Sequence, residues 1–461
     1  MNQSMSVSAG TMGGRQAAVR TVTVIGAGGA MGTGVSGLFA AYGGLQVYMV
    51  NRTPERGAAA VGRAVRSVRG SSIASRLIPT PFEKLEEAVA DSDLVFESAA
   101  EDAAVKAALL TRAAAALRPG AWLCTGTSGL SVTELAARLP AEVRPRFFGM
   151  HFFNPPGKMP LCELIPTPDT DRDLLAEVRA WLEAVLLRQV VTVGDKPAFL
   201  ANRIGLYFLN RAAALADTYR TRGGIDYIDA IFGGCTGRAM PPLATVDFIG
   251  LDVHDAIMRN LLENTADCAH DTFAVPDYMR ELIRRGATGS KAGAGLFRKG
   301  TDEDGKPVRE VYDIETDSYR PIRAYGFRFV EKMDDHLRDG DYAGGFRALL
   351  EDTSEEAAIC REMIGSYLLY AAVTAAEVGC SLADADAAMA TGFNWCPPLA
   401  WIDGLRSVHP DPLSRLCQPL CSSDQLRDAL ACLREAEAGM PRGQGRLSAY
   451  DFRPYFRAEH S

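Results

Sequence analysis

The chain lacks several features that would place it in common classes of protein. No apolar run reaches the roughly 18 residues that a membrane-spanning helix needs. Basic residues do not outnumber acidic ones, because 49 Lys and Arg stand against 57 Asp and Glu and the net charge is −8. The whole molecule is therefore no electrostatic match for nucleic acid or for an anionic membrane, and neither is expected as a partner.

Cysteine patterns typical of disulfide scaffolds or zinc sites are also missing. The ten cysteines are spread over a long chain with no apolar secretory segment, which indicates reduced thiols and a cytoplasmic protein. The tightest group, Cys417, Cys421 and Cys432, lacks the paired spacing of structural zinc, so no metal is expected. Residues 1–20 are polar and rich in small residues, and we expect a disordered leader there.

What the first part of the chain does contain is the order of elements of a nucleotide-binding fold. The β-branched run TVTVI leads into GAGGAMGTG, a helical stretch follows, and LQVYMVN has the character of a second strand. In such a unit Gly26 permits a tight turn, Gly28 lets the backbone approach a pyrophosphate, and Gly32 allows close packing of helix on strand. Three further strand-like runs alternate with helical stretches, which predicts a Rossmann-type doubly wound α/β domain over residues 21–196.

The end of the second strand carries Asn51 and Arg52, where an NAD enzyme usually has a carboxylate. A carboxylate there binds the ribose 2′-hydroxyl and repels a 2′-phosphate. Asn51 removes that repulsion, and Arg52 can pair with a 2′-phosphate. The sequence predicts NAD or NADP, with a slight preference for NADP. In the alternative interpretation Asn51 binds the ribose hydroxyls and Arg52 is a solvated surface residue.

The run GMHFFNPPGKMPLCE (149–163) places His151 twelve residues before Glu163. Oxidising an alcohol needs a base for the hydroxyl proton, and histidine titrates near working pH. A carboxylate can fix the histidine tautomer and stabilise the imidazolium. We therefore predict that His151 is a general base oriented by Glu163; the alternative is a packed core histidine beside a surface carboxylate.

Several motifs, in order, resemble the L-3-hydroxyacyl-CoA dehydrogenase family over residues 21–300 and more weakly to residue 405. They are the glycine turn, FESAAEDAAVKAALL, TSGLSVTELA, GMHFFNPPGKMPLCELIP, FLANRIGLYFLNRA and GSKAGAGLF. The resemblance implies an NAD(P)-dependent enzyme that interconverts L-3-hydroxyacyl and 3-ketoacyl thioesters of CoA, in β-oxidation or in biosynthesis. It also implies functional residues: His151 as base, Glu163 as its orienting carboxylate, Ser128 and Asn202 on the substrate, and Glu101, Lys106, Asn154 and Lys291 on the cofactor.

The chain departs from the family pattern next to the acyl site. The SNTSS-like turn of the family has Gly126 in place of its asparagine and Gly129 in place of its second serine. The DTPGF-like residues become Asp195 to Phe199, with Ala198 in place of the glycine. These changes are expected to affect acyl-chain preference more than the chemistry.

The region that holds CoA in the family is shortened here. Arg63, Arg66 and Arg69 recur at a spacing that can put them on one helix face, where they can bind the CoA phosphates or form a solvated basic face. The same chemistry on a carrier-protein thioester or a free 3-hydroxy acid therefore stays open. A catalytically inactive nucleotide-binding scaffold is the alternative of another class, disfavoured by the presence of all four central residues.

The C-terminal half contains an internal repeat. IGLYFLNRAAALAD matches IGSYLLYAAVTAAE further on, and MPPLATVDFIGL matches CPPLAWIDGL. We expect two all-α domains in tandem, the first at 197–300 and a degenerate copy at 346–461, joined by a linker with a hairpin at 301–345. This arrangement resembles the dehydrogenase part of the multifunctional fatty-acid oxidation proteins.

The copy differs from the first unit at the position of the substrate contact, because Glu362 stands where the first unit has Asn202. The copy is therefore expected to be structural. A tandem copy can also cover, within one chain, the surface through which single-copy members of the family pair. A monomer or a homodimer is expected.

Overall fold

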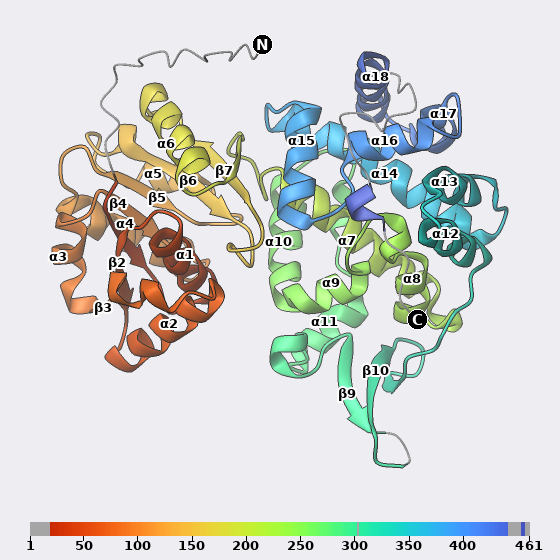
Figure 1. The fold of residues 1–461 in the computed structure, drawn as a ribbon, viewed down its shortest axis with the longest axis horizontal. Coiled ribbons are helices and arrows are strands. Elements are labelled where there is room, and N and C mark those ends of the chain that lie inside the picture. The colour runs from red at the N-terminus through yellow and green to blue at the C-terminus, as the bar shows by residue number, and fades with distance from the viewer. Residues whose placement is uncertain (1–18, 302–303, 441–452, 457–461) are drawn as a thin grey trace, which may run out of the picture.

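The computed structural model describes residues 19–301, 304–440 and 453–456, and the expected leader lies almost entirely outside them. Figure 1 shows a sheet domain, coloured red to yellow, beside a larger helical body, coloured green to blue. The strands of the large sheet are β1 (Thr21–Ile25), β2 (Gln46–Asn51), β3 (Leu77–Pro81), β4 (Leu94–Glu97), β5 (Trp122–Thr125), β6 (Phe147–Phe152), β7 (Leu161–Pro166) and β8 (Gln189–Thr192).

The order of the strands in the sheet is β3-β2-β1-β4-β5-β6-β7-β8, and all neighbours are parallel except β6 and β7. The strands are short apolar runs buried on both faces, because helices cover both sides. One core cluster packs the sheet against α1, α2 and α6, and the other packs it against α3, α4 and α5. These helices are α1 (Ala30–Ala41), α2 (Pro54–Ser67), α3 (Leu85–Ala90), α4 (Ala103–Ala116), α5 (Val132–Ala136) and α6 (Arg172–Ala184).

The helical body follows β8 and shares one continuous apolar core with the second face of the sheet. Its first unit comprises α7 (Ala201–Thr218), α8 (Ile225–Ile231), α9 (Pro242–Ile249), α10 (Leu251–Asn264) and α11 (Asp277–Arg284). Its later helices are α12 (Arg328–Arg338), α13 (Tyr342–Glu351), α14 (Glu355–Glu377), α15 (Leu382–Ala388), α16 (Pro398–Arg406), α17 (Pro412–Leu416) and α18 (Asp424–Gly439). The predicted fold class, a Rossmann-type domain followed by two all-α domains in tandem, is confirmed.

Between the two helical units lies a small antiparallel sheet of β9 (Phe297–Thr301), β10 (Pro307–Asp313) and β11 (Ser318–Pro321). It projects from the helical body in Figure 1. The segment expected to be a linker with a hairpin thus contains β10 and β11, and it also contains all of α12. No single helix among the described residues is long and apolar enough to cross a membrane. Helix α14 and the segment Leu382–Phe393 are long and apolar enough only when taken together, and the chain bends by 113° between them.

Candidate active site

The glycine turn between β1 and α1 fits a dinucleotide phosphate cradle. A Cβ atom on Gly26 would lie 2.5 Å from the Ser98 carbonyl oxygen, and one on Gly32 would lie 2.5 Å from the Gly26 carbonyl oxygen. Gly26 also has a φ of +82°, which residues with side chains rarely adopt. The turn therefore needs glycine for its shape and for close packing, and it leaves the start of α1 open to phosphate.

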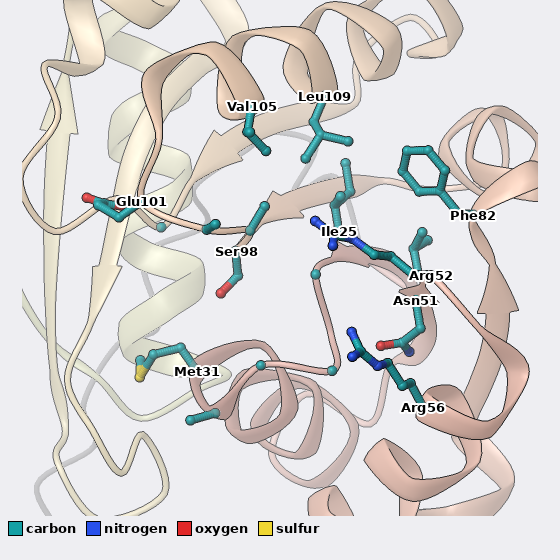
Figure 2. Close-up of a pocket in the computed structure, with 18 of the residues that line it drawn as sticks. Ile25, Met31, Asn51, Arg52, Arg56, Phe82, Ser98, Glu101, Val105 and Leu109 are labelled. Carbon is teal, nitrogen blue, oxygen red and sulfur yellow. The ribbon is translucent and has the colours of Figure 1, made fainter. Parts of the chain in front are cut away.

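A cavity of about 1380 Å³ lies over this turn. Residues at the ends of β1 and β2 line one part of it, and Glu101, Gly126 and Ser128 line another. The cavity exceeds the roughly 300–1,000 Å³ that is common for small-molecule sites, as an extended dinucleotide requires. Figure 2 shows Glu101 at one end of the pocket and Arg52, Arg56 and Phe82 at the other. The residues of this chain thus fit a nicotinamide dinucleotide.

Basic side chains gather at the second end of the cavity. Asn51 is buried, and its Nδ2 donates to the Met49 carbonyl oxygen at 3.0 Å. Arg52, Arg56 and Arg63 line the same end, and the Arg63 guanidinium donates to the Gly28 carbonyl oxygen at 2.8 Å. Within the described part of the chain, Arg52 and Arg56 form no ion pair. They are therefore free to meet an anionic group in the pocket.

The three arginines predicted for the CoA phosphates do not share one face. Arg63 lies at the dinucleotide cavity, whereas Arg66 and Arg69 are exposed and do not line it. Helix α2 ends at Ser67, and Arg69 follows with a φ of +52°. The expectation of one helix face therefore does not hold for Arg69, because the chain has already left the helix there.

His151 lies between Glu163, its predicted orienting carboxylate, and Ser128, which was predicted as a substrate contact. Strands β6 and β7 are antiparallel with His151 directly opposite Glu163, so the spacing of twelve residues becomes one cross-strand pair. The His151 Nδ1 lies 2.8 Å from Glu163 Oε2, and Nε2 lies 3.1 Å from the Ser128 hydroxyl. Both His151 and Glu163 are buried, with relative exposures of 3% and 0%. A proton on Nδ1, donated to the carboxylate, leaves the Nε2 lone pair facing Ser128.

Glu163 also ties the sheet to the first helical unit. Its Oε1 accepts from the backbone N–H groups of Leu200 at 3.2 Å and Ala201 at 2.9 Å, where α7 begins. The two residues before them, Ala198 and Phe199, have φ values of +59° and +52°. This conformation is costly for residues that carry a Cβ, so the start of α7 is strained beside the histidine.

The turn that carries Ser128 is held by Glu101. One carboxylate oxygen accepts from the Thr127 hydroxyl and from the backbone N–H groups of Ser128 at 2.8 Å and Gly129 at 3.0 Å. Burial opposes ionisation of Glu101, but the Lys106 ammonium at 3.4 Å and these donors outweigh it and lower its pKa. A carboxylate anion therefore holds the turn at the edge of the cavity.

Lys106, predicted as a cofactor contact, is buried and does not line the cavity. Its ammonium lies 3.0 Å from Glu97 Oε1, and Glu97 is fully buried. Glu97 also accepts from the Thr125 hydroxyl at 2.7 Å and from the Ala99 N–H at 2.6 Å. The sequence reasoning did not single out Glu97, although a carboxylate at the carboxyl end of a buried strand was a usable signal.

The remaining predicted residues are placed but not joined to this network. Asn202 lies in the first turn of α7, directly after the two N–H groups that Glu163 binds. Asn154 is exposed after β6, and Lys291 is exposed on the 3₁₀ turn Ser290–Ala292. Within the described ranges, no side-chain hydrogen bond links Asn202, Asn154 or Lys291 to another predicted site residue. No group of three or more metal-binding side chains occurs among the described residues either.

A partly buried aspartate that borders the predicted acyl site has a structural task. Asp195 accepts from the Ser131 hydroxyl at 2.8 Å and from the N–H groups of Val132 at 3.1 Å and Thr133 at 2.8 Å. It thereby caps the start of α5, just after the serine turn. A second polar contact to the turn, from Asn260, was also missed, and no local signal in the sequence could have revealed it.

Comparison with known proteins agrees with this geometry. The model for the NAD binding domain of 3-hydroxyacyl-CoA dehydrogenase matches residues 21–196, and the model for the C-terminal domain matches residues 199–299. A 3-hydroxybutyryl-CoA dehydrogenase of Bradyrhizobium diazoefficiens is 38% identical over 61% of this chain and 96% of its own length. A probable 3-hydroxyacyl-CoA dehydrogenase of Bacillus subtilis is 29% identical over 70% of this chain, but the chain spans only 40% of that protein.

Among solved structures, a 3-hydroxybutyryl-CoA dehydrogenase from Escherichia coli K12 matches with a TM-score of 0.64 and 23% identity. The match covers 91% of this chain and 99% of that one, so the likeness in fold extends through both helical units. Together with the NAD binding domain model, the geometry supports a nicotinamide cofactor.

Proposed function

Because the chain belongs to the 3-hydroxyacyl-CoA dehydrogenase family, we propose that it interconverts L-3-hydroxyacyl-CoA and 3-ketoacyl-CoA with a nicotinamide cofactor. The observation that carries the proposal is His151, held 2.8 Å from Glu163 and 3.1 Å from Ser128. Ser128 also lines the dinucleotide cavity, so the base adjoins the place where a hydride acceptor binds. The alternative substrates, a carrier-protein thioester and a free hydroxy acid, have no comparable support.

In the oxidation, His151 Nε2 takes the proton of the 3-hydroxyl group. Glu163, fully buried and hydrogen-bonded to Nδ1, holds this tautomer and stabilises the imidazolium that forms. The Ser128 hydroxyl can donate to the substrate oxygen, and Asn202, at the start of α7, is proposed to do the same. The nicotinamide supplies the acceptor for the hydride when it is bound.

The test is turnover of acetoacetyl-CoA, followed by the change in nicotinamide absorbance. Purified protein should reduce it, and His151→Ala should lower kcat by about 10²–10⁴-fold while nucleotide binding is kept. If the unaltered protein shows no turnover but binds nucleotide, the catalytically inactive scaffold replaces this proposal.

The finer proposal for the cofactor is a preference for NADP over NAD. It is supported by Asn51 at the end of β2 and by the three arginines at the same end of the cavity, Arg52, Arg56 and Arg63. A 2′-phosphate there would meet these guanidinium groups, and the last residue of β2 is Asn51 and not a carboxylate. Glu55 lines the pocket as well, and its charge works against this preference.

The ratio of kcat/KM for NADPH and NADH tests the cofactor proposal. Loss of one charge-assisted phosphate contact in Arg52→Ala or Arg56→Ala should lower kcat/KM for NADPH by about tenfold and leave NADH within about twofold. A wild-type preference for NADH of a hundredfold would contradict the proposal. Arg66→Ala serves as the control, because Arg66 lies outside the cavity.

The proposed oligomeric state is a monomer. Helix α7 of the first unit packs against α14 of the copy, with the Tyr207 and Tyr370 rings stacked at 4.0 Å. The copy thus covers α7 within one chain, where a second chain could otherwise pack. Light scattering after size exclusion should give the mass of one chain; the mass of two would contradict the proposal.

A further inference from the structure

The turn that carries Ser128 is fixed from two sides that belong to different bodies of the molecule. From the sheet domain, Glu101 accepts the N–H groups of Ser128 and Gly129. From the helical body, the Asn260 side chain on α10 donates its Nδ2 to the Gly129 carbonyl oxygen at 2.7 Å. Glu101 thus holds both peptide units that flank Ser128, and Asn260 holds the next one, between Gly129 and Leu130. Figure 1 shows α10 on the side of the helical body that faces the sheet domain.

The direction of the Asn260 amide is itself determined by a neighbour. Asn264, one turn further along α10, donates its Nδ2 to Asn260 Oδ1 at 2.7 Å. Since that oxygen is occupied as an acceptor, the amide presents its nitrogen to Gly129 and not its oxygen. The contact spans 131 residues of sequence and joins the two bodies next to His151.

Gly129 is complementary to this contact. A Cβ atom at position 129 would lie 3.2 Å from Asn260 Nδ2, closer than ordinary contact distance. Its backbone does not require glycine, because Gly129 is not among the glycines with positive φ. The absence of a side chain therefore serves the approach of Asn260. This accounts for the glycine at position 129, where the family has the second serine of its SNTSS-like turn.

From these contacts we infer that Asn260 is a positioning residue for Ser128, acting from the helical body through the Gly129 carbonyl group. The expected kinetic effect rests on the proposed dehydrogenase function. The contact of Asn260 with the Gly129 carbonyl group, here called the clamp, does not depend on that function. Holding the turn fixes the direction of the Ser128 hydroxyl, which lies 3.1 Å from His151 Nε2. Small displacements of such a group are costly, since a shift of about 1 Å can lower a rate by about a hundredfold.

The first test compares Asn260→Ala with Glu263→Ala, an exposed residue on the same helix. Asn260→Ala should lower kcat for acetoacetyl-CoA by about tenfold or more and leave the KM for the nucleotide within about twofold. Glu263→Ala should change neither. Thermal unfolding of each variant separates this effect from a general loss of fold. An active wild type with an unchanged kcat in Asn260→Ala would overturn the inference and leave the proposed function standing.

The second test exploits the fit between the two positions. Gly129→Ser alone should lower kcat by about three- to tenfold, because its Cβ crowds the Asn260 amide. In the Asn260→Gly background the same change should cost less than about twofold, which is the coupling expected if Gly129→Ser acts by displacing the Asn260 amide. Additive losses in the double variant would contradict the inference.

A third readout does not depend on activity. Hydrogen exchange of the segment 126–130, followed by mass spectrometry, should be at least about threefold faster in Asn260→Ala than in wild type and unchanged in Glu263→Ala. If the wild type does not turn over any thioester, the proposed function fails, and this measurement still decides on the clamp. Equal exchange in all three proteins would overturn it.

Discussion

The two helical units share their architecture but not their part in the site. The first unit provides the N–H groups that bind Glu163 and the Asn260 contact to the serine turn. The second provides no residue of this kind within the described chain, and its Glu362 pairs with Arg211 of the first unit at 2.8 Å. The position that corresponds to the predicted substrate contact has thus become part of the interface between the units.

Both units keep a buried aspartate that caps the helix beginning at the Pro-Pro-Leu-Ala sequence. Asp229 accepts from the N–H groups of Leu243 at 2.7 Å and Ala244 at 2.9 Å, and Asp386 accepts from the Leu399 N–H at 2.7 Å. The repeat therefore preserves this capping contact and changes the position of the predicted substrate contact. This difference identifies fold determinants without any other sequence.

The largest difference between the units is expected in catalysis. Glu163→Gln should lower kcat by about 10³–10⁴-fold, because a neutral amide beside Nδ1 neither holds the productive tautomer nor stabilises the imidazolium. Glu362→Gln, in the second unit, should change kcat by less than about twofold, since that ion pair is exposed. Steady-state kinetics on both variants measures the contrast. Similar losses in the two would mean that the copy takes part in the reaction.

The next largest effect concerns the buried polar contacts that join the two units. Asp267 of the first unit accepts from Arg203 and from the Tyr370 hydroxyl of the second at 2.8 Å, and all three are buried. Asp267→Ala leaves a buried guanidinium with less compensation and should lower the free energy of unfolding by about 3 kcal/mol. Denaturation in urea measures it, with Glu362→Ala as the exposed ion-pair control. A loss below about 1 kcal/mol would show that the units hold together without this network.

A pH-dependent effect of about the same size or smaller should appear in both units. Burial raises the pKa of Asp229 and of Asp386 to about 7 each, although backbone N–H donors oppose it. An acid whose pKa is raised in the folded state contributes stability below its unfolded pKa of about 4, and loses it as the pH rises through 7. Asp386→Asn should therefore gain stability relative to wild type, by about 1–4 kcal/mol, between pH 4 and pH 8.

Urea denaturation across that pH range checks the prediction, and Asp229→Asn should give a similar slope from the first unit. A constant difference from wild type at every pH would contradict it.

The smallest expected effect comes from a difference between the residues that precede the two long helices, α7 and α14. Before α7, Ala198 has a φ of +59°, whereas α14 begins with Ser354 as a regular cap that accepts from the Ala357 N–H at 3.3 Å. Ala198→Gly should raise the free energy of unfolding by about 0.5–1 kcal/mol because glycine tolerates this φ, and Ser354→Ala should lower it by about 1 kcal/mol. Thermal unfolding of the two variants should therefore shift in opposite directions. If Ala198→Gly is destabilising, the strain has been overestimated.

Much of the site was predictable where the contact is local or follows from strand register. The glycine turn needs only neighbouring residues, and His151 with Glu163 needs only two adjacent antiparallel strands. The serine turn could be located by its motif, but not its partners. The family resemblance implies Lys106 as a cofactor contact, and nothing in the sequence shows that it is buried against Glu97.

The sequence by itself predicted the Rossmann-type domain from its local pattern and the tandem helical units from an internal repeat. The spacing of His151 and Glu163 predicted their pairing, because two adjacent antiparallel strands bring them together. Only the tertiary structure decided that Arg63 lies at Gly28 and that Asn260 reaches Gly129. Such contacts depend on how distant parts of the chain pack together, and the type of a residue does not show whether it will lie on the surface or in a site. The candidate residues could therefore be predicted from the chain, but their positioning required the fold.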